Sequence, residues 1–389
     1  MAATTMTGAV ADPPERAHSR VIISATLNST LGFFDAQTLV ESQPPLVSRG
    51  LAPVRLKVFD AGSGPLLLAA NHGIEGSLGM FDLSGDLVTE MAASPVPARP
   101  GSVGVDAVDV DGIGPMAFVT NTWQALGGCG LPKGSVTAYQ FVGTGPATTA
   151  VEASTVDVSG AIPYAVAADH AGRAFVSTNC GNTLDTINVA PGSPLPTVTN
   201  TATRTTGSGP DGTLFDAVRN RVYVTNIGGS SLSVFDPTTP TARTTVPMPG
   251  AKAIDISFAD MEASASTPAR SLIATSNGGN DTAGLVDRDI IESCIAAAQA
   301  SCPEAVVLTT FGGVVGGAPE GIAFDPVSSR LFVINKTIGA PALAVIDIAQ
   351  DAFGVLSAGT PAVIKLGALG QTAPQVPALI AFDVVVQTR

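Results

Sequence analysis

The chain has 389 residues, with 19 basic and 32 acidic side chains and a formal net charge of −13. This balance argues against nucleic acid and anionic membranes as partners, because a phosphate surface attracts a basic face and the sequence contains no run of Lys or Arg. No uninterrupted apolar stretch reaches the roughly 18 residues that a membrane-spanning helix needs, so we expect no membrane insertion.

The N-terminal segment, residues 1–19, is polar, contains Pro and lacks the hydrophobic core of a signal peptide. We expect it to form a mobile arm. The remainder, residues 20–389, consists of short Val-, Thr- and Ala-rich runs broken by Gly, Pro and Asn, which is typical of β-strands and turns. We therefore expect residues 20–389 to form one domain.

A hairpin pattern of two apolar runs around a polar turn recurs along the chain. Its seven copies lie at 20–35, 66–82, 116–140, 173–188, 221–236, 271–287 and 330–347. An Asn closes the first strand in six copies: Asn71, Asn121, Asn179, Asn226, Asn277 and Asn335. These Asn residues are 47 to 58 residues apart, and a repeat of about that length with several short strands is typical of a β-propeller.

One further short strand precedes most of the hairpins. These leading strands lie at 53–60, 105–111, 163–169, 210–216, 251–257, 319–325 and 377–383. The last has no hairpin after it, and the first hairpin has no leading strand before it. We therefore predict an all-β, seven-bladed β-propeller in which the C-terminal strand completes the first blade and removes the open sheet edges.

Most leading strands end in an acid, and we interpret these acids as turn caps, since Asp bonds readily to the backbone that follows it. They are Asp60, Asp111, Asp169, Asp216, Asp325 and Asp383. We give the Asn series a structural role as well.

The motif Tyr223-Val224-Thr225-Asn226 resembles the signature of the YVTN-repeat family of seven-bladed β-propellers. The resemblance covers nearly the whole chain past residue 20. It implies the fold but leaves the function open, because such propellers are similar to lactonase-type enzymes, to cofactor-enzyme subunits and to surface binding proteins.

The leading strands should be the innermost strands of their blades, so the start of each should lie at the mouth of the central channel, on the same face as the hairpin turns. These rim positions are Ala378, Arg55, Asp106, Tyr164, Asp211, Lys252 and Glu320. The copy at 251–257 is imperfect, and a shift of three residues would place Asp255 there instead of Lys252. The rim is either a polar ligand-binding pocket or a set of positions that tolerate polar residues because water fills the channel.

The hairpin turns of the second and third blades depart from the repeat. The second contains His72 and Glu75, and the third is the longest and contains the only tryptophan, Trp123. Elaborated turns on one face of a repeat protein often form its binding surface. His72 is the best candidate for a general base, because imidazole titrates near neutral pH; the alternative is an ordinary surface histidine.

We predict no cofactor from this sequence. A metal alternative would use Asp106, Asp211 and Glu320 as oxygen ligands for Ca²⁺ or Mg²⁺. The neighbouring cations Arg55 and Lys252 argue against a tight divalent site, because they would already neutralise those acids.

The four cysteines show no metal-binding spacing, and their arrangement favours disulfides. Cys129 and Cys180 fall in hairpin turns of adjacent blades and could join the third blade to the fourth. Cys294 and Cys302 flank a predicted helical insertion on the far face, and they can bond only if that helix ends early and turns back. Two disulfides would indicate an oxidising compartment, the periplasm or the cell exterior.

Two functions fit these observations. The first is a monomeric secreted or periplasmic propeller that binds a small molecule, a glycan or a protein at the channel mouth. The second is a lactonase- or lyase-like enzyme with His72 or Tyr164 as the acid or base, in which Arg55 or Lys252 would hold a carboxylate or enolate oxygen.

Overall fold

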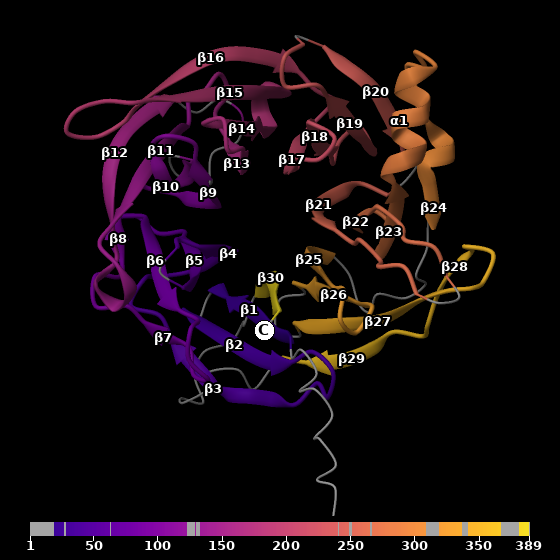
Figure 1. Cartoon of the computed structure of the whole chain (residues 1–389), viewed down its shortest axis with the longest axis horizontal. Helices are drawn as coiled ribbons and strands as arrows, with labels where there is room; N and C mark the ends of the chain where they lie inside the picture. The colour runs from indigo at the N-terminus through magenta and orange to yellow at the C-terminus, as the bar shows by residue number, and fades with distance from the viewer. Residues whose placement is uncertain are drawn as a thin grey trace, which may run out of the picture.

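A computed structural model describes residues 19–26, 29–62, 64–122, 129, 133–239, 241–248, 251–264, 267–308, 319–336, 341–366 and 381–388. These residues form seven antiparallel sheets arranged as the blades of a ring (Figure 1), which confirms the predicted seven-bladed propeller. Residues 1–18 of the predicted N-terminal arm, Trp123 and Ala378 lie outside the described residues, whereas Ser19 belongs to the first strand.

The first four blades contain these strands, given from the strand nearest the channel outwards. Blade one has β30 (Ala381–Thr388), β1 (Ser19–Ala25), β2 (Thr30–Asp35) and β3 (Glu41–Val47). Blade two has β4 (Pro53–Asp60), β5 (Pro65–Asn71), β6 (Ser77–Asp82), β7 (Thr89–Glu90) and β8 (Val96–Pro97). Blade three has β9 (Ser102–Val110), β10 (Gly114–Asn121), β11 (Ser135–Val142) and β12 (Thr149–Asp157). Blade four has β13 (Pro163–Ala168), β14 (Arg173–Thr178), β15 (Thr183–Ala190) and β16 (Thr197–Thr205).

The last three blades repeat this order. Blade five has β17 (Pro210–Asp216), β18 (Arg221–Asn226), β19 (Ser231–Phe235) and β20 (Ala242–Pro247). Blade six has β21 (Ala253–Phe258), β22 (Leu272–Asn277), β23 (Thr282–Asp287) and β24 (Val306–Leu308). Blade seven has β25 (Pro319–Asp325), β26 (Arg330–Asn335), β27 (Ala342–Gln350), β28 (Leu356–Ala358) and β29 (Ala362–Lys365).

The C-terminal strand closes the ring. β30 pairs antiparallel with β1, with Ser19 opposite Thr388 and Ala25 opposite Ala381. It also lies against the innermost strands of both neighbouring blades, β25 and β4. The strand begins at Ala381, so Asp383 is its third residue and not its last, as the leading-strand pattern had suggested.

The hydrophobic core is divided into seven clusters, each of which fills the space between two adjacent blades. The motif of blade five shows how the sequence produces this arrangement. Val222 and Val224 pack against Phe175 of blade four, whereas Tyr223 points to the opposite side and packs against Ile273 of blade six. Successive side chains of a strand point to opposite faces, so a strand buried on both faces reads as a continuous apolar run.

The helix α1 (Arg288–Ala296) follows β23 directly and lies at the outer edge of the ring beside β20 (Figure 1). Its first residue, Arg288, forms ion pairs with Asp216 and Asp260. The helix ends at Ala296, and Ala298 has a left-handed φ of 53°, which turns the chain back. The Cα atoms of Cys294 and Cys302 are therefore 5.9 Å apart and the two residues form a disulfide, as predicted.

The second predicted disulfide is also present. Cys129 and Cys180 are joined with a Cα–Cα distance of 5.1 Å and connect the turns of blades three and four. Among the described residues, no helix is long and apolar enough to cross a membrane.

Candidate functional site

Every innermost strand contains a β-bulge near its start. In six blades the pairing register between this strand and its neighbour shifts at the residue before the Asn position of the neighbour. In blade four Asn179 lies one residue further along the chain, and the shift falls at Ser177. In blade five, for example, Asp211 and Gly212 together lie opposite Thr225. A bulge redirects side chains, and the charged and phenolic residues of the channel lie within these bulges. The first bulge position holds Tyr164, Asp211 and Glu320, and the second holds Arg55, Asp255 and Asp383.

A series of hydroxyl groups holds these bulges in place. The Thr225 hydroxyl accepts a hydrogen bond from the Gly212 amide (2.7 Å) and donates one to the Ile254 carbonyl of the next blade (2.7 Å). The same pair of bonds, one within the blade and one to the next blade, is made by Ser24, Thr120, Ser177 and Ser276. Blades two and seven have Ala70 and Ile334 at this position.

Arg55 lies at the centre of the charged cluster. Its guanidinium is 2.7 Å from Asp255 Oδ2, 3.7 Å from Asp383 Oδ1 and 3.8 Å from Asp211 Oδ1. Arg55, Asp211 and Asp383 are each less than a tenth exposed. One cation from blade two therefore faces three carboxylates from blades six, one and five.

Two of these carboxylates also bind the backbone of the following blade. Asp383 Oδ2 accepts the Leu56 amide (2.7 Å), and Asp255 Oδ2 accepts the Ile322 amide (3.2 Å). Asp383 is thus part of the channel cluster, and our interpretation of it as a turn cap was wrong. The cap interpretation holds at Asp60 and Asp216, whose carboxylates accept amides two residues further along the chain.

Two more ion pairs flank the cluster. Glu320 Oε2 is 2.6 Å from Lys336 Nζ, and Asp106 Oδ1 is 2.6 Å from Lys57 Nζ. Asp106 also accepts the Ala168 amide of blade four (2.7 Å) through its second oxygen. It lies beyond the bulge of its strand, so it points to a level of the channel different from that of Asp211.

The electrostatics of the cluster favour protonated carboxyls. Burial raises the pKa of Asp211 to about 8, and the opposing effect of Arg55 does not cancel this rise. Burial likewise raises the pKa of Asp383 to about 7, although Arg55 and two backbone amides act to lower it. Burial, together with Asp211 and Glu320, raises the pKa of the Tyr164 phenol to about 12, so this group acts as a hydrogen-bond donor at neutral pH.

A cavity of about 740 Å³ adjoins the cluster inside the ring. The innermost strands of all seven blades line it, and Arg55, Asp255 and Asp383 form its charged end. Its other end lies at the turns that follow the innermost strands, where Asp60, His170 and Ala217 line it. The cavity therefore extends from the cluster towards the face opposite the hairpin turns.

The remaining predicted site residues lie apart from this cavity. His72 is partly buried in the second blade, and burial lowers its pKa; its Nδ1 makes no hydrogen bond among the described residues. Glu75 is exposed. Lys252 is exposed and precedes β21, and Asp255, the alternative considered for that copy, occupies the bulge.

The predicted acidic metal ligands are not gathered into one site. Asp106 and Glu320 each pair with a lysine, and Asp211 lies beside Arg55. Among the described residues, the only grouping of three metal-ligating side chains is Cys294, Cys302 and Glu304, whose two sulfur atoms are already joined in a disulfide.

Lys57, Lys336 and the hydroxyl series were not identified from the sequence. The hydroxyl series did leave a signal, because Ser or Thr precedes the Asn position in most copies of the repeat. The two lysines left no such signal, because each occurs in one blade only and is not part of the repeat.

Comparison with known proteins supports the fold alone. No family model matches the chain, and no curated protein matches it. Several solved structures match over nearly their whole length, and three of them are lactonases by name. A periplasmic gluconolactonase from Pseudomonas aeruginosa is 16% identical, with a TM-score of 0.62 and coverage of 90% of this chain and 97% of that chain. A protein from Bacteroides fragilis, provisionally assigned as a 6-phosphogluconolactonase, is 14% identical, with a TM-score of 0.60 and coverage of 97% and 100%. A Lactobacillus plantarum protein is 15% identical, with a TM-score of 0.64 and coverage of 95% and 99%.

Proposed function

We propose that this protein is a secreted or periplasmic propeller that binds a small hydroxylated molecule in its central channel. The cavity of about 740 Å³ beside the Arg55 cluster is the observation that carries the proposal. Its volume lies within the range of about 300–1,000 Å³ that is usual for ligand pockets. Two carboxyl groups, those of Asp255 and Asp383, face the single cation Arg55 at its charged end. Carboxyl oxygens accept hydrogen bonds, so the complementary ligand presents donors such as hydroxyl groups.

The disulfides support a location outside the cytosol. Disulfides persist in oxidising compartments and are rare where thiols are kept reduced. The similarity to a periplasmic gluconolactonase and the Tyr223–Asn226 motif of YVTN-type propellers are compatible with this location.

A substitution at the open end of the cavity tests the proposal. Ala217 is exposed and lines that end, so Ala217→Trp should obstruct entry without disturbing the core. Val218, its neighbour, is 90% exposed and does not line the cavity, so Val218→Trp is the matched control. Thermal unfolding would be measured with a panel of aldonolactones, aldonic acids and sugars. A ligand at about 100 times its Kd should add about 2.7 kcal/mol to the stability.

We expect a thermal shift in the wild type and in Val218→Trp, and a much smaller one in Ala217→Trp. Equal shifts in all three proteins would place the ligand elsewhere. The absence of a shift with every compound would overturn the small-molecule proposal and leave a protein partner of the hairpin-turn face as the alternative.

A second candidate function is lactone hydrolysis in the same cavity. Asp383 lines the cavity and its pKa of about 7 suits a group that gives and takes protons at neutral pH. In such a reaction water attacks the lactone carbonyl, the ring C–O bond breaks, and the leaving oxygen takes a proton to give a hydroxy acid. Arg55 would stabilise the negative charge that develops on the carbonyl oxygen, and Tyr164 remains a proposed contributor. His72, the general base proposed from the sequence, lies apart from this cavity.

Acid release from glucono-δ-lactone above the spontaneous rate would test this function. We expect Asp383→Asn to lower kcat by at least about 100-fold, as loss of a general acid–base group does. His72→Asn should leave the rate unchanged if Asp383 alone transfers protons. If the wild type produces no acid above the uncatalysed rate, the protein is a binder and not a lactonase.

A further inference from the structure

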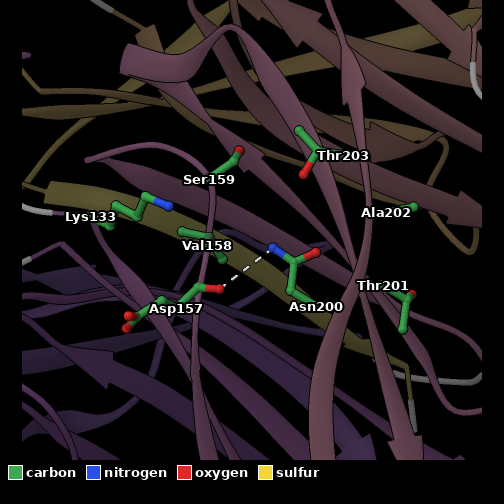
Figure 2. Close-up of a pocket in the computed structure, with 8 residues that line it drawn as sticks. All are labelled: Lys133, Asp157, Val158, Ser159, Asn200, Thr201, Ala202 and Thr203. Carbon is green, nitrogen blue, oxygen red and sulfur yellow. Dashed lines mark hydrogen bonds between the residues drawn. The ribbon is translucent and has the colours of Figure 1, made fainter.

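A second pocket lies away from the channel, between the outer strands of blades three and four. Its volume is about 360 Å³ (Figure 2). One wall is formed by Lys133 and the end of β12 with the segment that follows it, and the other by β16. Figure 2 labels the side chains that line it: Lys133, Asp157, Val158, Ser159, Asn200, Thr201, Ala202 and Thr203.

A fully buried carboxylate behind this pocket fixes three of its lining residues. Asp185, on β15, accepts hydrogen bonds from the Ser159 hydroxyl (2.7 Å), from Asn200 Nδ2 (3.2 Å) and from the Thr203 hydroxyl. The Ser159 amide donates a further bond to it (2.9 Å). Asp185 is 0% exposed, so it shapes the pocket without touching its contents.

These bonds decide which hydrogen-bonding groups remain for a ligand. A carboxylate only accepts, so the hydroxyl protons of Ser159 and Thr203 are directed inwards, to Asp185. Asn200 directs its amino group the same way and also towards the Asp157 carbonyl (3.5 Å; Figure 2). The Thr201 hydroxyl donates to the Thr186 carbonyl (3.2 Å). The pocket is therefore left with oxygen acceptors, namely Asn200 Oδ1 and the lone pairs of the threonine hydroxyls.

The two charged residues of the pocket restrict the ligand further. Lys133 supplies an ammonium donor and Asp157 an exposed carboxylate. An amine would be repelled by Lys133 and an anion by Asp157. A neutral molecule with several hydroxyl groups satisfies both, because each hydroxyl can donate to the acceptors and its oxygen can accept from Lys133.

The walls are held together before any ligand arrives. The Gly134 amide donates to the Gly160 carbonyl (2.9 Å), and the Val158 amide donates to the Gly134 carbonyl (3.0 Å). The disulfide between Cys129 and Cys180 joins the same two blades on this side of the molecule. Rigid walls lower the entropy that is lost on binding.

From this geometry we infer that the pocket between blades three and four is a saccharide-binding site, separate from the channel. The volume accommodates one or two sugar rings. The site does not depend on the function proposed for the channel, and it gives the propeller a peripheral contact with carbohydrate.

Saturation-transfer NMR with methyl glycosides of glucose, galactose, mannose and N-acetylglucosamine would test the site. We expect Lys133→Ala and Asn200→Ala each to weaken the binding of the preferred glycoside about tenfold, the loss of roughly one good hydrogen bond. Thr199 is exposed on the same strand but does not line the pocket, so Thr199→Ala is the matched control and should bind normally. Lys133 is exposed, so Lys133→Ala should fold normally. A loss of glycoside binding in this variant therefore reports on the site itself, even if Asn200→Ala is unstable.

The channel variant Ala217→Trp distinguishes this site from the channel. Binding that survives Ala217→Trp and falls with Lys133→Ala supports the peripheral site, whatever the channel binds. Two results would overturn the inference: no glycoside bound by the wild type, or binding that Ala217→Trp removes and Lys133→Ala leaves intact.

Discussion

At the scale of single residues, Arg55 and its three acidic partners dominate the channel. The cluster contains one guanidinium and three carboxyl groups, all largely removed from water. Burial disfavours the charged form of a carboxyl, and neighbouring acids add to the effect. The cluster therefore binds protons at pH values where exposed carboxyls have lost them, and the stability of the protein should depend on pH.

Asp211 should make the protein less stable as the pH rises. Its pKa is about 8 in the folded protein, against an ordinary value of 3.8, so between these values the folded state holds a proton that the unfolded state has lost. Stability then falls by up to about 1.4 kcal/mol per pH unit for one such group. Asp211→Asn, which is neutral throughout, should flatten the decline in chemical-denaturation measurements between pH 5 and pH 8.

Asp236 provides a control of opposite sign. Burial acts to raise its pKa, but hydrogen bonds from Thr238 and the charge of Arg221 lower it overall. Asp236 therefore stabilises the protein above the ordinary pKa of an aspartate, and Asp236→Asn should cost most at neutral pH. If Asp211→Asn showed the same pH profile as Asp236→Asn, Asp211 would be ionised in the folded protein.

The sequence identified part of this cluster and missed part, for a definite physical reason. Tyr164, Asp211 and Glu320 directly follow a Pro that marks the start of a strand, and Arg55 lies two residues after one, so their positions could be predicted from the repeat. Asp255 follows no such Pro, and a bulge shifts the register by one residue without any marker in the sequence. Asp383 shares its local pattern with the turn caps, and only the pairing of β30 with β1 reveals that it lies in mid-strand near the channel.

At the scale of the strand, a hydroxyl at the bulge connects five of the seven blades to the next blade. Thr225 illustrates why a hydroxyl is required, since one oxygen accepts from Gly212 and donates to Ile254. A methyl group in its place would leave a buried amide and a buried carbonyl without partners. The repeat in the sequence predicts the strands of each blade. It does not predict the hydrogen bonds between blades, because these depend on how closely two neighbouring blades approach each other.

Thr225→Val should destabilise the protein by about 1–3 kcal/mol, the usual cost of leaving buried polar groups unsatisfied. Thr244→Val is the matched control, because Thr244 is equally buried on β20 but its hydroxyl has no hydrogen-bond partner in the described part of the chain. Valine should be neutral or stabilising there. Both free energies would come from denaturant unfolding, and equal losses at the two positions would show that the hydroxyl bond between blades contributes nothing.

At the scale of the whole molecule, ring closure and the channel cluster depend on the same strand. β30 is the innermost strand of blade one and packs against the innermost strands of blades seven and two. It also brings Asp383 to Arg55. The unmatched first hairpin and unmatched last strand allowed this closure to be predicted from the sequence. The consequence for the cluster could not be predicted, because it depends on which residue of the strand faces the channel.

Circular permutation tests whether the ring needs β30 only as the innermost strand of blade one, or also needs that strand to come from the C-terminal end of the chain. Ser19 and Thr388 lie opposite each other in the β1–β30 pair, so a short turn can join them. New termini would be placed between Lys365 and Ala381, after the end of β29. Blade one of this permutant then has the same strand order as the other blades. We expect it to fold, with a melting temperature near that of the wild type and with the pH dependence caused by Asp211 intact, since every sheet contact is kept.

Deletion of residues 381–389 is the matched comparison, because it removes the same strand without replacing it. β1 then presents an unpaired edge, and Arg55 loses Asp383 while two interblade cores open to water. We expect this protein to aggregate or to unfold without cooperativity, because exposed strand edges pair with other chains. Size-exclusion chromatography and thermal unfolding would compare the two. A permutant that fails as badly as the deletion would mean that the covalent order of the chain, and not the strand in the ring, holds the propeller closed.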